Sequence, residues 1–188
     1  MPAAIASKDE VLDRLMSAFR DKGYDGASLA ELSEATGLQK SSLYHHFPGG
    51  KSEMAMQVLA HLDQQLSARL YDPLRSAGTP ARKLGAMLDV LDDFYEGGRK
   101  ACLLERLVAS VERTQFRKPL RRAFSDWMDA VEALCLEAGL PKGVARERAE
   151  EFVVRVEGAL VVCAATGDYG MFARTLAALR ATVLAPGR

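Results

Sequence analysis

Apolar residues recur along this chain at steps of three and four positions, the spacing that places side chains on one face of an α-helix. Val11, Leu15 and Phe19 form one such stripe, and Trp127 and Val131 belong to another. The pattern predicts helices at about residues 3–22, 29–36, 39–46, 50–74, 80–95, 102–111, 119–138, 142–166 and 168–184. The chain is therefore expected to be all-α, with about nine helices.

Residues that cap or break helices mark the boundaries between these segments. Ser7 and Glu10 have the spacing of a capping box, in which a hydroxyl and a carboxylate each bind a backbone N–H at the start of a helix. Ser28 and Glu31 have the same spacing. Gly23 is expected to close the first helix. Further breaks are expected where glycine and proline cluster, at residues 76–80, 96–99 and 139–141.

Residues 28–51 contain two short predicted helices joined at Gly37, where a tight turn favours a residue that tolerates positive φ. Two such helices are typical of a helix-turn-helix, whose second helix enters the DNA major groove. Leu43 and Phe47 lie four positions apart and are expected to anchor the second helix to a core that includes Phe19. A helical hairpin that serves only for packing is the alternative interpretation.

The other faces of this second helix carry side chains that donate hydrogen bonds to phosphates and base edges. The expected DNA-binding residues are Ser28, Gln39, Lys40, Ser41, Ser42, Tyr44, His45 and Lys51. We assign Tyr44, Lys51 and the Ser28 end to phosphates, because a helix start and a lysine both favour an anion. The candidates for base edges are Gln39, Lys40, Ser42 and His45.

The segment from Leu43 to Lys51, LYHHFPGGK, resembles the LYxxF motif and the following lysine of the TetR family of transcriptional regulators. Its Pro-Gly-Gly-Lys ending resembles the multidrug-repressor subgroup of that family. The resemblance implies a DNA-binding domain at residues 1–50, with three helices, and an effector-binding and dimerisation domain at residues 51–188. It also implies a ligand-responsive repressor that binds a pseudo-palindromic operator as a homodimer, with recognition helices separated by about one DNA turn, roughly 34–36 Å, or somewhat more.

A helical bundle binds the effector in that family, and bundle interiors commonly hold apolar ligands. The resemblance therefore implies a small, apolar effector of unknown identity, although apolar residues at helical spacing also suit an ordinary core. The candidate ligand-binding residues are Leu91, Phe94, Tyr95, Cys102, Leu104, Leu107, Val108, Phe124, Trp127, Met128 and Val131. No cofactor is expected.

The predicted helix at residues 142–166 is unusually apolar in its second half. An apolar face wider than a core requires indicates a partner surface, and small residues there permit close helix contact. The last two helices pair across a two-fold axis in the TetR family, so the resemblance implies a homodimer. A buried core helix is the alternative. The candidate dimerisation residues are Val154, Gly158, Val161, Val162, Ala165, Phe172, Leu176, Leu179 and Val183.

Composition limits the class of protein further. The chain has 188 residues, 48% of them apolar, and a net charge of zero, which is not typical of a nucleic-acid binder. However, residues 35–51 contain no acid and carry Lys40, Lys51, His45 and His46, which gives a local positive face. No apolar run reaches membrane length and no secretory signal is visible, so we expect a cytoplasmic protein without a membrane partner.

The cysteines and the absence of catalytic motifs leave other functions open. Cys102, Cys135 and Cys163 are far apart and odd in number, which argues against a disulfide framework or a zinc site. Cys102 lies shortly after Arg99 and Lys100, so a thiol-based sensor of electrophiles or oxidants is one alternative, and a small apolar residue is the other. No phosphate loop or nucleophile motif indicates an enzyme. A helical interaction module without DNA binding is a further alternative.

Overall fold

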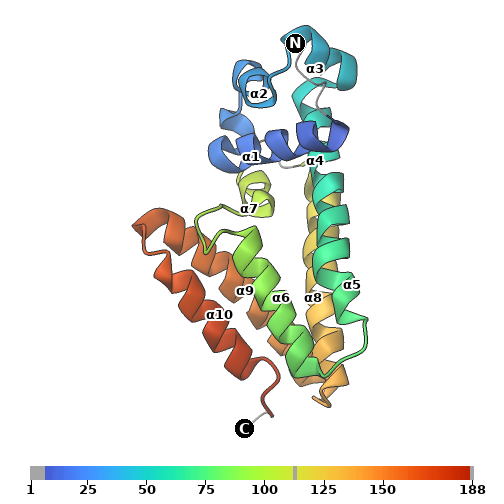
Figure 1. Cartoon of the computed structure of the whole chain (residues 1–188), viewed down its shortest axis with the longest axis vertical. Helices are drawn as coiled ribbons and strands as arrows, with labels where there is room; N and C mark the ends of the chain where they lie inside the picture. The colour runs from blue at the N-terminus through green and yellow to red at the C-terminus, as the bar shows by residue number, and fades with distance from the viewer. Residues whose placement is uncertain (1–6, 112–113, 187–188) are drawn as a thin grey trace. The chain divides into compact units, whose positions relative to one another are not determined.

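A computed structural model describes residues 7–111 and 114–186, and every regular element in these ranges is a helix (Figure 1). If η1 and α5 are taken as the continuation of α4, these elements make nine helices, and the prediction of an all-α fold is confirmed. Their bounds are α1 Lys8–Gly26, α2 Leu29–Thr36, α3 Lys40–His46, α4 Gly50–Leu66, η1 Ser67–Tyr71, α5 Asp72–Leu74, α6 Pro80–Phe94, α7 Leu103–Val108, α8 Arg117–Glu137, α9 Lys142–Thr166 and α10 Gly170–Thr182.

The chain forms two compact units. The N-terminal unit comprises residues 1–64 and 103–117, and the C-terminal unit comprises residues 65–102 and 118–188. The boundary therefore falls inside α4, and α7 belongs to the N-terminal unit, where it packs against α1 (Figure 1). The predicted boundary after residue 50 separates a DNA-binding part from an effector-binding and dimerisation part. It divides the chain by function, not into compact units, and it stays a prediction.

The core of the N-terminal unit is built from the residues that the apolar pattern selects. Leu15, Phe19, Leu32, Leu43 and Phe47 are all buried, with at most 1% of their surface exposed. Burial of one such side chain contributes about 1.5–3 kcal/mol, so these residues fix the three short helices against one another. Leu43 and Phe47 thus anchor α3, as predicted.

Polar contacts attach the segment after α7 to the rest of the N-terminal unit. Gln115 Nε2 donates to the Tyr24 hydroxyl at 3.3 Å, and the Ser52 hydroxyl donates to Gln115 Oε1. The backbone N–H of Val111 donates to Asp25 Oδ2 at 2.9 Å. Residues more than sixty positions apart in the sequence are joined here, which explains why helical spacing alone placed α7 with the central bundle.

The capping residues predicted from the sequence do bind the helix starts. Both capping boxes form: Ser7 and Glu10 bind each other's backbone N–H groups before α1, and Ser28 and Glu31 do so before α2. The first helix is interrupted at Gly23, the position where the sequence predicted its end. Gly23 has φ 71° and ψ 170°, so it bends the helix, and α1 resumes as far as Gly26. The expected residues 3–6 of this helix lie outside the described part of the chain.

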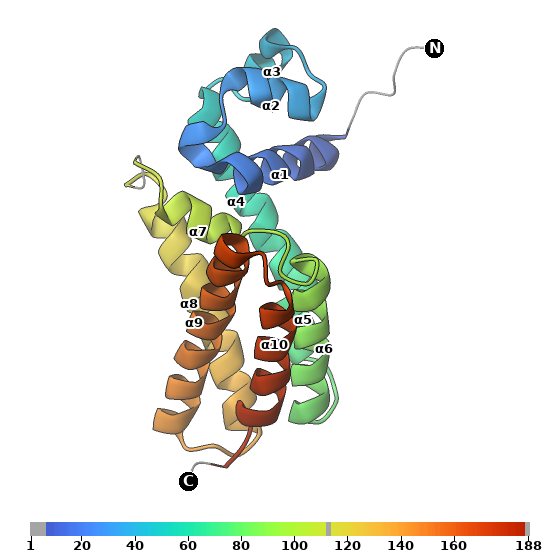
Figure 2. The same cartoon turned by 90° about the vertical axis from the view of Figure 1, so that its left-hand side faces the viewer.

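The C-terminal unit is a helical bundle in which α9 and α10 are neighbours and α6 packs against α10 (Figure 2). The sequence predicted an uninterrupted helix to about residue 74, but residues Ser67–Tyr71 form a π-helical turn before α5. Pro73 follows this turn. A proline ring clashes with the carbonyl four residues earlier, here that of Arg69, and a wider turn relieves that clash.

The loop between α6 and α7 has an unusual backbone. Glu96, Gly97 and Gly98 all have positive φ, at 48°, 64° and 86°. At Gly98 a Cβ atom would lie 2.7 Å from Phe172 Cβ on α10, closer than real Cβ atoms approach one another. Glycine is therefore required at this position both for its conformation and for its close approach to α10.

Candidate nucleic-acid interface

Side-chain hydrogen bonds to the backbone fix the turn between α2 and α3. Gly37 has φ 71°, the left-handed conformation expected at the end of α2. The Thr36 hydroxyl donates to the Leu32 carbonyl at 2.7 Å and accepts the Leu38 N–H at 3.3 Å. From α1, Arg14 Nη1 donates to the Thr36 carbonyl at 2.8 Å. The orientation of α3 relative to α2 therefore depends on both the turn and α1.

The short helix α3 has one buried face and several exposed polar positions. Leu43 is buried on it, and Phe47 is buried directly after it. Most of the predicted DNA-binding residues in this region are exposed, namely Gln39, Lys40, Ser41, Tyr44 and His45. Ser42 is half-buried. Gln39 precedes the helix and makes no capping hydrogen bond with its side chain. The exposed donors thus cluster on a helix that the core holds in place.

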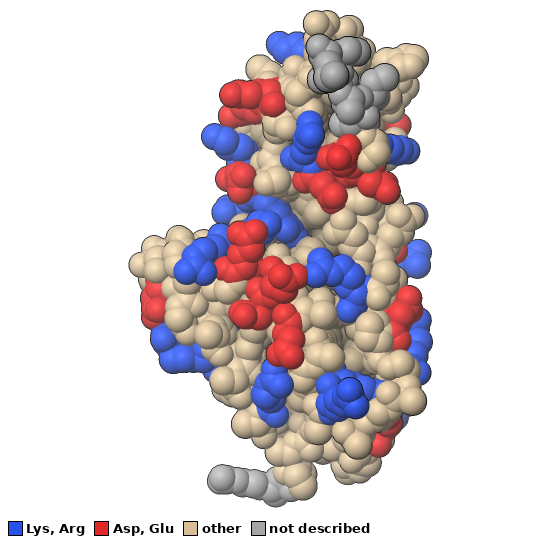
Figure 3. Space-filling view, viewed as in Figure 1, with Lys and Arg blue, Asp and Glu red and all other residues tan. Residues whose placement is uncertain are grey.

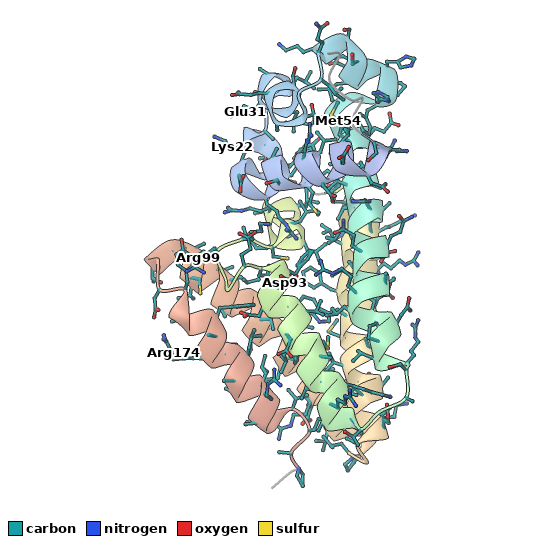
Figure 4. The ribbon with its side chains drawn as sticks, in the orientation of Figure 1. Lys22, Glu31, Met54, Asp93, Arg99 and Arg174 are labelled. Carbon is teal, nitrogen blue, oxygen red and sulfur yellow. The ribbon has the colours of Figure 1, made fainter. Side chains whose placement is uncertain are left out.

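Ser28 is exposed, but its polar groups are engaged with Glu31. The Ser28 N–H donates to Glu31 Oε2 at 2.8 Å, and the Ser28 hydroxyl accepts the Glu31 N–H at 3.3 Å. The bonds from the Ser28 backbone and hydroxyl, with smaller effects from Lys22, lower the pKa of Glu31. Lys22 Nζ lies 3.7 Å from Glu31 Oε1 (Figure 4). An ionised carboxylate therefore stands at the α2 start that was assigned to phosphate.

Lys51, the residue assigned to a phosphate, binds a carbonyl of its own unit. Its Nζ donates to the Tyr24 carbonyl at 2.9 Å and lies 4.5 Å from the centre of the Tyr24 ring. This contact joins the first turn of α4 to the end of α1, and the side chain is half-buried. Lys51 therefore makes a structural contact and also places its ammonium group near the start of α4.

The start of α4 carries a feature that the sequence analysis missed. The Gly49 N–H donates to Glu53 Oε2 at 2.6 Å, so a carboxylate occupies one of the free N–H groups at this helix start. The signal was an acid in the first turn, which commonly caps a helix. Tyr44 packs close by, because a Cβ at Gly50 would lie 3.6 Å from Tyr44 Cε1. With 47% of its surface exposed, Tyr44 nevertheless remains accessible.

Positive charge is local on this protein. Figure 3 shows Lys and Arg interspersed with Asp and Glu on the face it draws. Within residues 35–51, by contrast, Lys40, His45 and His46 are exposed and no acid occurs. Such a distribution supports a few phosphate contacts by a short segment, rather than attraction of DNA to a whole basic face.

The predicted ligand-binding residues divide between the two units. In the C-terminal unit Leu91, Tyr95, Cys102, Trp127 and Val131 are buried, and Phe94, Phe124 and Met128 are half-buried. Leu104 and Leu107 are buried on α7 and Val108 is exposed there, so these three residues lie in the N-terminal unit. The five buried residues therefore belong to the core of the C-terminal unit.

Cys102 lies in an environment unlike that of a reactive thiol. It is buried, and the Tyr95 hydroxyl donates to its Sγ at 3.5 Å. The two neighbouring cations are directed elsewhere. Lys100 pairs with Glu96 at 2.6 Å, and the Arg99 guanidinium lies 5.3 Å from the centre of the Tyr169 ring. The structure gives no support to the electrophile-sensor alternative, because reactive cysteines are accessible and lie beside positive charge.

The predicted dimerisation residues fall into two groups. On α9, Val154, Gly158, Val161, Val162 and Ala165 are exposed, and Val154 has 70% of its surface accessible. The candidates on α10 and directly after it are buried in the core of the C-terminal unit, namely Phe172, Leu176, Leu179 and Val183. The periodic pattern of α10 reflects packing within one chain, whereas the stripe on α9 remains free to meet a partner.

Among residues 7–111 and 114–186, no group of three His, Cys, Asp or Glu side chains is arranged to hold a metal ion. None of the helices in these ranges has the length and apolarity needed to cross a membrane.

Comparison with known proteins identifies relatives for both parts of the chain. Residues 7–58 match the family described as "Bacterial regulatory proteins, tetR family", and residues 80–177 match the "Transcriptional regulator LmrA/YxaF-like, C-terminal domain". The HTH-type transcriptional regulator LmrA of Bacillus subtilis (strain 168) is 24% identical over 160 residues, which cover 83% of this chain and 85% of LmrA.

Solved structures share the fold. A TetR transcriptional regulator from Legionella pneumophila superposes with a TM-score of 0.84 at 17% identity, covering 96% of this chain and 99% of that one. The TetR family regulator CifR, solved as a cysteine mutant with 26-base-pair operator DNA, has a TM-score of 0.59 at 24% identity and covers 98% of this chain and 94% of its own. These similarities establish the same all-helical architecture.

Proposed function

This chain belongs to the TetR family of bacterial regulatory proteins and is a transcriptional regulator, not an enzyme, and from that premise we propose that it is a ligand-responsive repressor that binds a pseudo-palindromic operator as a homodimer. The observation that carries the proposal is the geometry of α3. Leu43 and Phe47 anchor this helix while its polar side chains face outward. A short, firmly held helix with exposed donors is what reading of a major groove requires.

The proposed contacts follow from exposure and charge. Gln39, Lys40 and His45 are exposed on and beside α3 and meet base edges, with Ser42 at the margin of this group. Tyr44 reaches a phosphate, and Lys51 contributes charge from the start of α4 while it holds the Tyr24 carbonyl. Glu53 and Glu31 oppose phosphates at the two neighbouring helix starts, which leaves α3 as the main site of favourable contact.

The exposed stripe on α9 is the proposed dimer surface. Valines and small residues at positions 154, 158, 161, 162 and 165 are accessible in the single chain. Contact with the same stripe of a second copy would remove them from water about a two-fold axis. A homodimer places two copies of α3 on one duplex, and the half-site spacing of the operator then reports the separation of the two helices.

The proposed switch is an effector that binds the C-terminal unit in the cytoplasm. It favours one conformation of the dimer over another, and it does so only because it binds the two with different affinity. In the effector-bound form the two copies of α3 no longer match the operator spacing, and the operator is released.

Selection from random duplex DNA tests this proposal. The wild-type protein is expected to enrich a pseudo-palindrome, and fluorescence anisotropy is then expected to show tight, salt-dependent binding to it. The double variant Lys40→Ala, His45→Ala is expected to lose that binding, whereas Lys142→Ala, an exposed lysine on α9, is expected to keep it. If no sequence is enriched, or if the double variant binds the selected DNA as well as wild type, the proposal is wrong.

A further inference from the structure

The indole nitrogen of Trp127, inside the C-terminal unit, lacks a hydrogen-bond partner among the described residues. Trp127 lies near the middle of α8 and has only 2% of its surface exposed. Its indole Nε1 is fully buried, and no acceptor within the described residues binds it. A buried N–H without an acceptor is unfavourable and uncommon in native proteins, so this atom requires an explanation.

The surroundings of Trp127 supply packing but no acceptor. The Phe152 ring on α9 meets the indole edge to face, with ring centres 6.3 Å apart. Val131 and Leu134 continue the buried face of α8 along one side of the helix. The carbonyl groups in the middle of α8 and α9 are engaged in the hydrogen bonds of those helices. The missing acceptor is therefore not a side chain or a backbone group of this region.

From this orphaned donor we propose that the effector of the C-terminal unit is a small aromatic carbonyl compound whose oxygen accepts the hydrogen bond of Trp127 Nε1. The proposal rests on the ligand-responsive function proposed above and specifies its ligand. The aromatic body of the compound packs against Phe152 and the apolar face of α8, in the way that aromatic rings pair at an angle.

Charge in this part of the bundle favours a neutral ligand. Arg146 is already bound to Asp129, Glu132 and Glu150 at 3.1, 3.2 and 2.8 Å. Arg148 and Arg155 both pair with Glu151. These arginines already lie beside carboxylates, so a carboxylate or phosphate ligand buried near Trp127 would meet like charge as well as positive charge, and burying it would be costly.

The lack of acceptors also selects the type of polar group. The indole Nε1–H is a donor only, so its partner must accept. A hydroxyl or amine could accept, but each would bring a donor of its own into apolar surroundings. A carbonyl oxygen accepts without adding a donor, so it satisfies Trp127 and leaves no new group unpaired.

Matched pairs of probes test the proposal, and Trp127 is the single tryptophan of the chain. Acetophenone and α-methylstyrene differ in a C=O and a C=CH₂ group of similar shape, and 9-fluorenone and 9-methylenefluorene form a second pair. In ¹H–¹⁵N correlation spectra of the full-length protein, each ketone is expected to move the lone indole cross-peak downfield. Each ketone is also expected to bind about three- to tenfold more tightly than its hydrocarbon partner.

Trp127→Phe keeps an aromatic ring and removes the donor. In this variant the two members of each pair are expected to bind equally, and circular dichroism checks that it is folded. If the variant does not fold, the movement of the indole peak and the ketone preference of the wild-type protein are sufficient to test the proposal. Equal affinity of ketone and hydrocarbon in wild type, an unmoved indole peak, or no binding by any probe at its solubility limit overturns the proposal.

Operator binding is measured separately by anisotropy without any probe. A protein that binds its operator but shows no ketone preference refutes the ligand assignment alone. A protein that prefers ketones but enriches no DNA refutes the proposed repressor function and leaves the Trp127 site standing.

Discussion

Two lysines beside the proposed DNA surface have different surroundings. Lys40 is exposed on α3 and free to reach a phosphate or base, whereas Lys51 holds the Tyr24 carbonyl at 2.9 Å. Residue type and place in a motif suggested that both lysines contact DNA, Lys51 at a phosphate and Lys40 near a base edge. Only the folded chain shows that Tyr24, at the end of α1, contacts Lys51, because these two residues lie 27 positions apart in the sequence. The sequence thus shows that a motif contains a charged residue, but it does not show which group that residue contacts.

Substitution of these lysines separates DNA contact from stability. Lys40→Ala is expected to weaken binding to DNA and to lower the slope of log affinity against log salt by about one, with the midpoint of thermal unfolding unchanged. Lys51→Ala is expected to lower the free energy of unfolding by about 1–2 kcal/mol through loss of the carbonyl and ring contacts, besides any change in slope. Anisotropy at several salt concentrations measures the affinity for DNA and its salt slope, and urea unfolding measures the free energy of unfolding. A stable Lys51→Ala with wild-type unfolding would contradict the structural contact.

Among helices and turns, the sequence predicted best what depends on neighbouring residues. The capping boxes at Ser7 and Ser28 and the left-handed Gly37 are set by contacts within a few residues. The burial of the α10 stripe and the docking of α7 on α1 depend on partners that are distant in sequence. His61 illustrates the same point, since its Nε2 lies 2.9 Å from Asp13 Oδ1, 48 positions away. Periodicity shows that a face is apolar, but not what covers it.

The cap of α2 makes a pH-dependent contribution to stability. Bonds from the Ser28 backbone and hydroxyl lower the pKa of Glu31 below its ordinary value of 4.5 in the folded protein. A lowered folded pKa means that the stabilisation is present above 4.5 and is lost as the pH falls through the folded value. Glu31→Gln is therefore expected to be less stable than wild type at neutral pH and equally stable in strong acid.

Urea unfolding at both pH values measures this difference, and Glu34→Gln provides a control on the same helix. Glu34 is exposed, and its substitution is expected to change stability little at either pH. A deficit of Glu31→Gln that persists unchanged in strong acid would show that the cap does not act through the ionised carboxylate.

The turn after α6 offers a matched test of glycine. Gly98 and Gly139 both have φ 86°, but only Gly98 faces a neighbour, with Phe172 Cβ 2.7 Å from the place of a Cβ. Both Gly→Ala substitutions are expected to cost about 1 kcal/mol or more for the backbone conformation, and Gly98→Ala is expected to cost about 1–3 kcal/mol in addition. Thermal unfolding compares the two variants. Equal losses would show that α10 does not pack closely against this loop.

For the whole molecule, the proposed function depends on a second copy of the chain. Val154→Glu and Val161→Glu together place charges on the exposed stripe of α9, where a partner would bury them. The variant is expected to dissociate about 100-fold more readily than wild type, because an unpaired buried charge is costly. Leu136→Glu, an exposed apolar residue of α8, serves as control. Sedimentation equilibrium measures both, and a variant as dimeric as wild type would exclude this stripe as the interface.

Operator spacing tests most directly the central claim that two copies of α3 read one duplex together. Once a pseudo-palindrome has been selected, its half-sites are moved apart by about five base pairs, which turns one half-site to the opposite side of the helix. Anisotropy then compares this DNA with the selected operator. The proposed homodimer predicts that the insertion abolishes high-affinity binding, because two linked helices cannot reach half-sites on opposite sides. Equal affinity for both DNAs would contradict it and would show that each chain binds DNA independently.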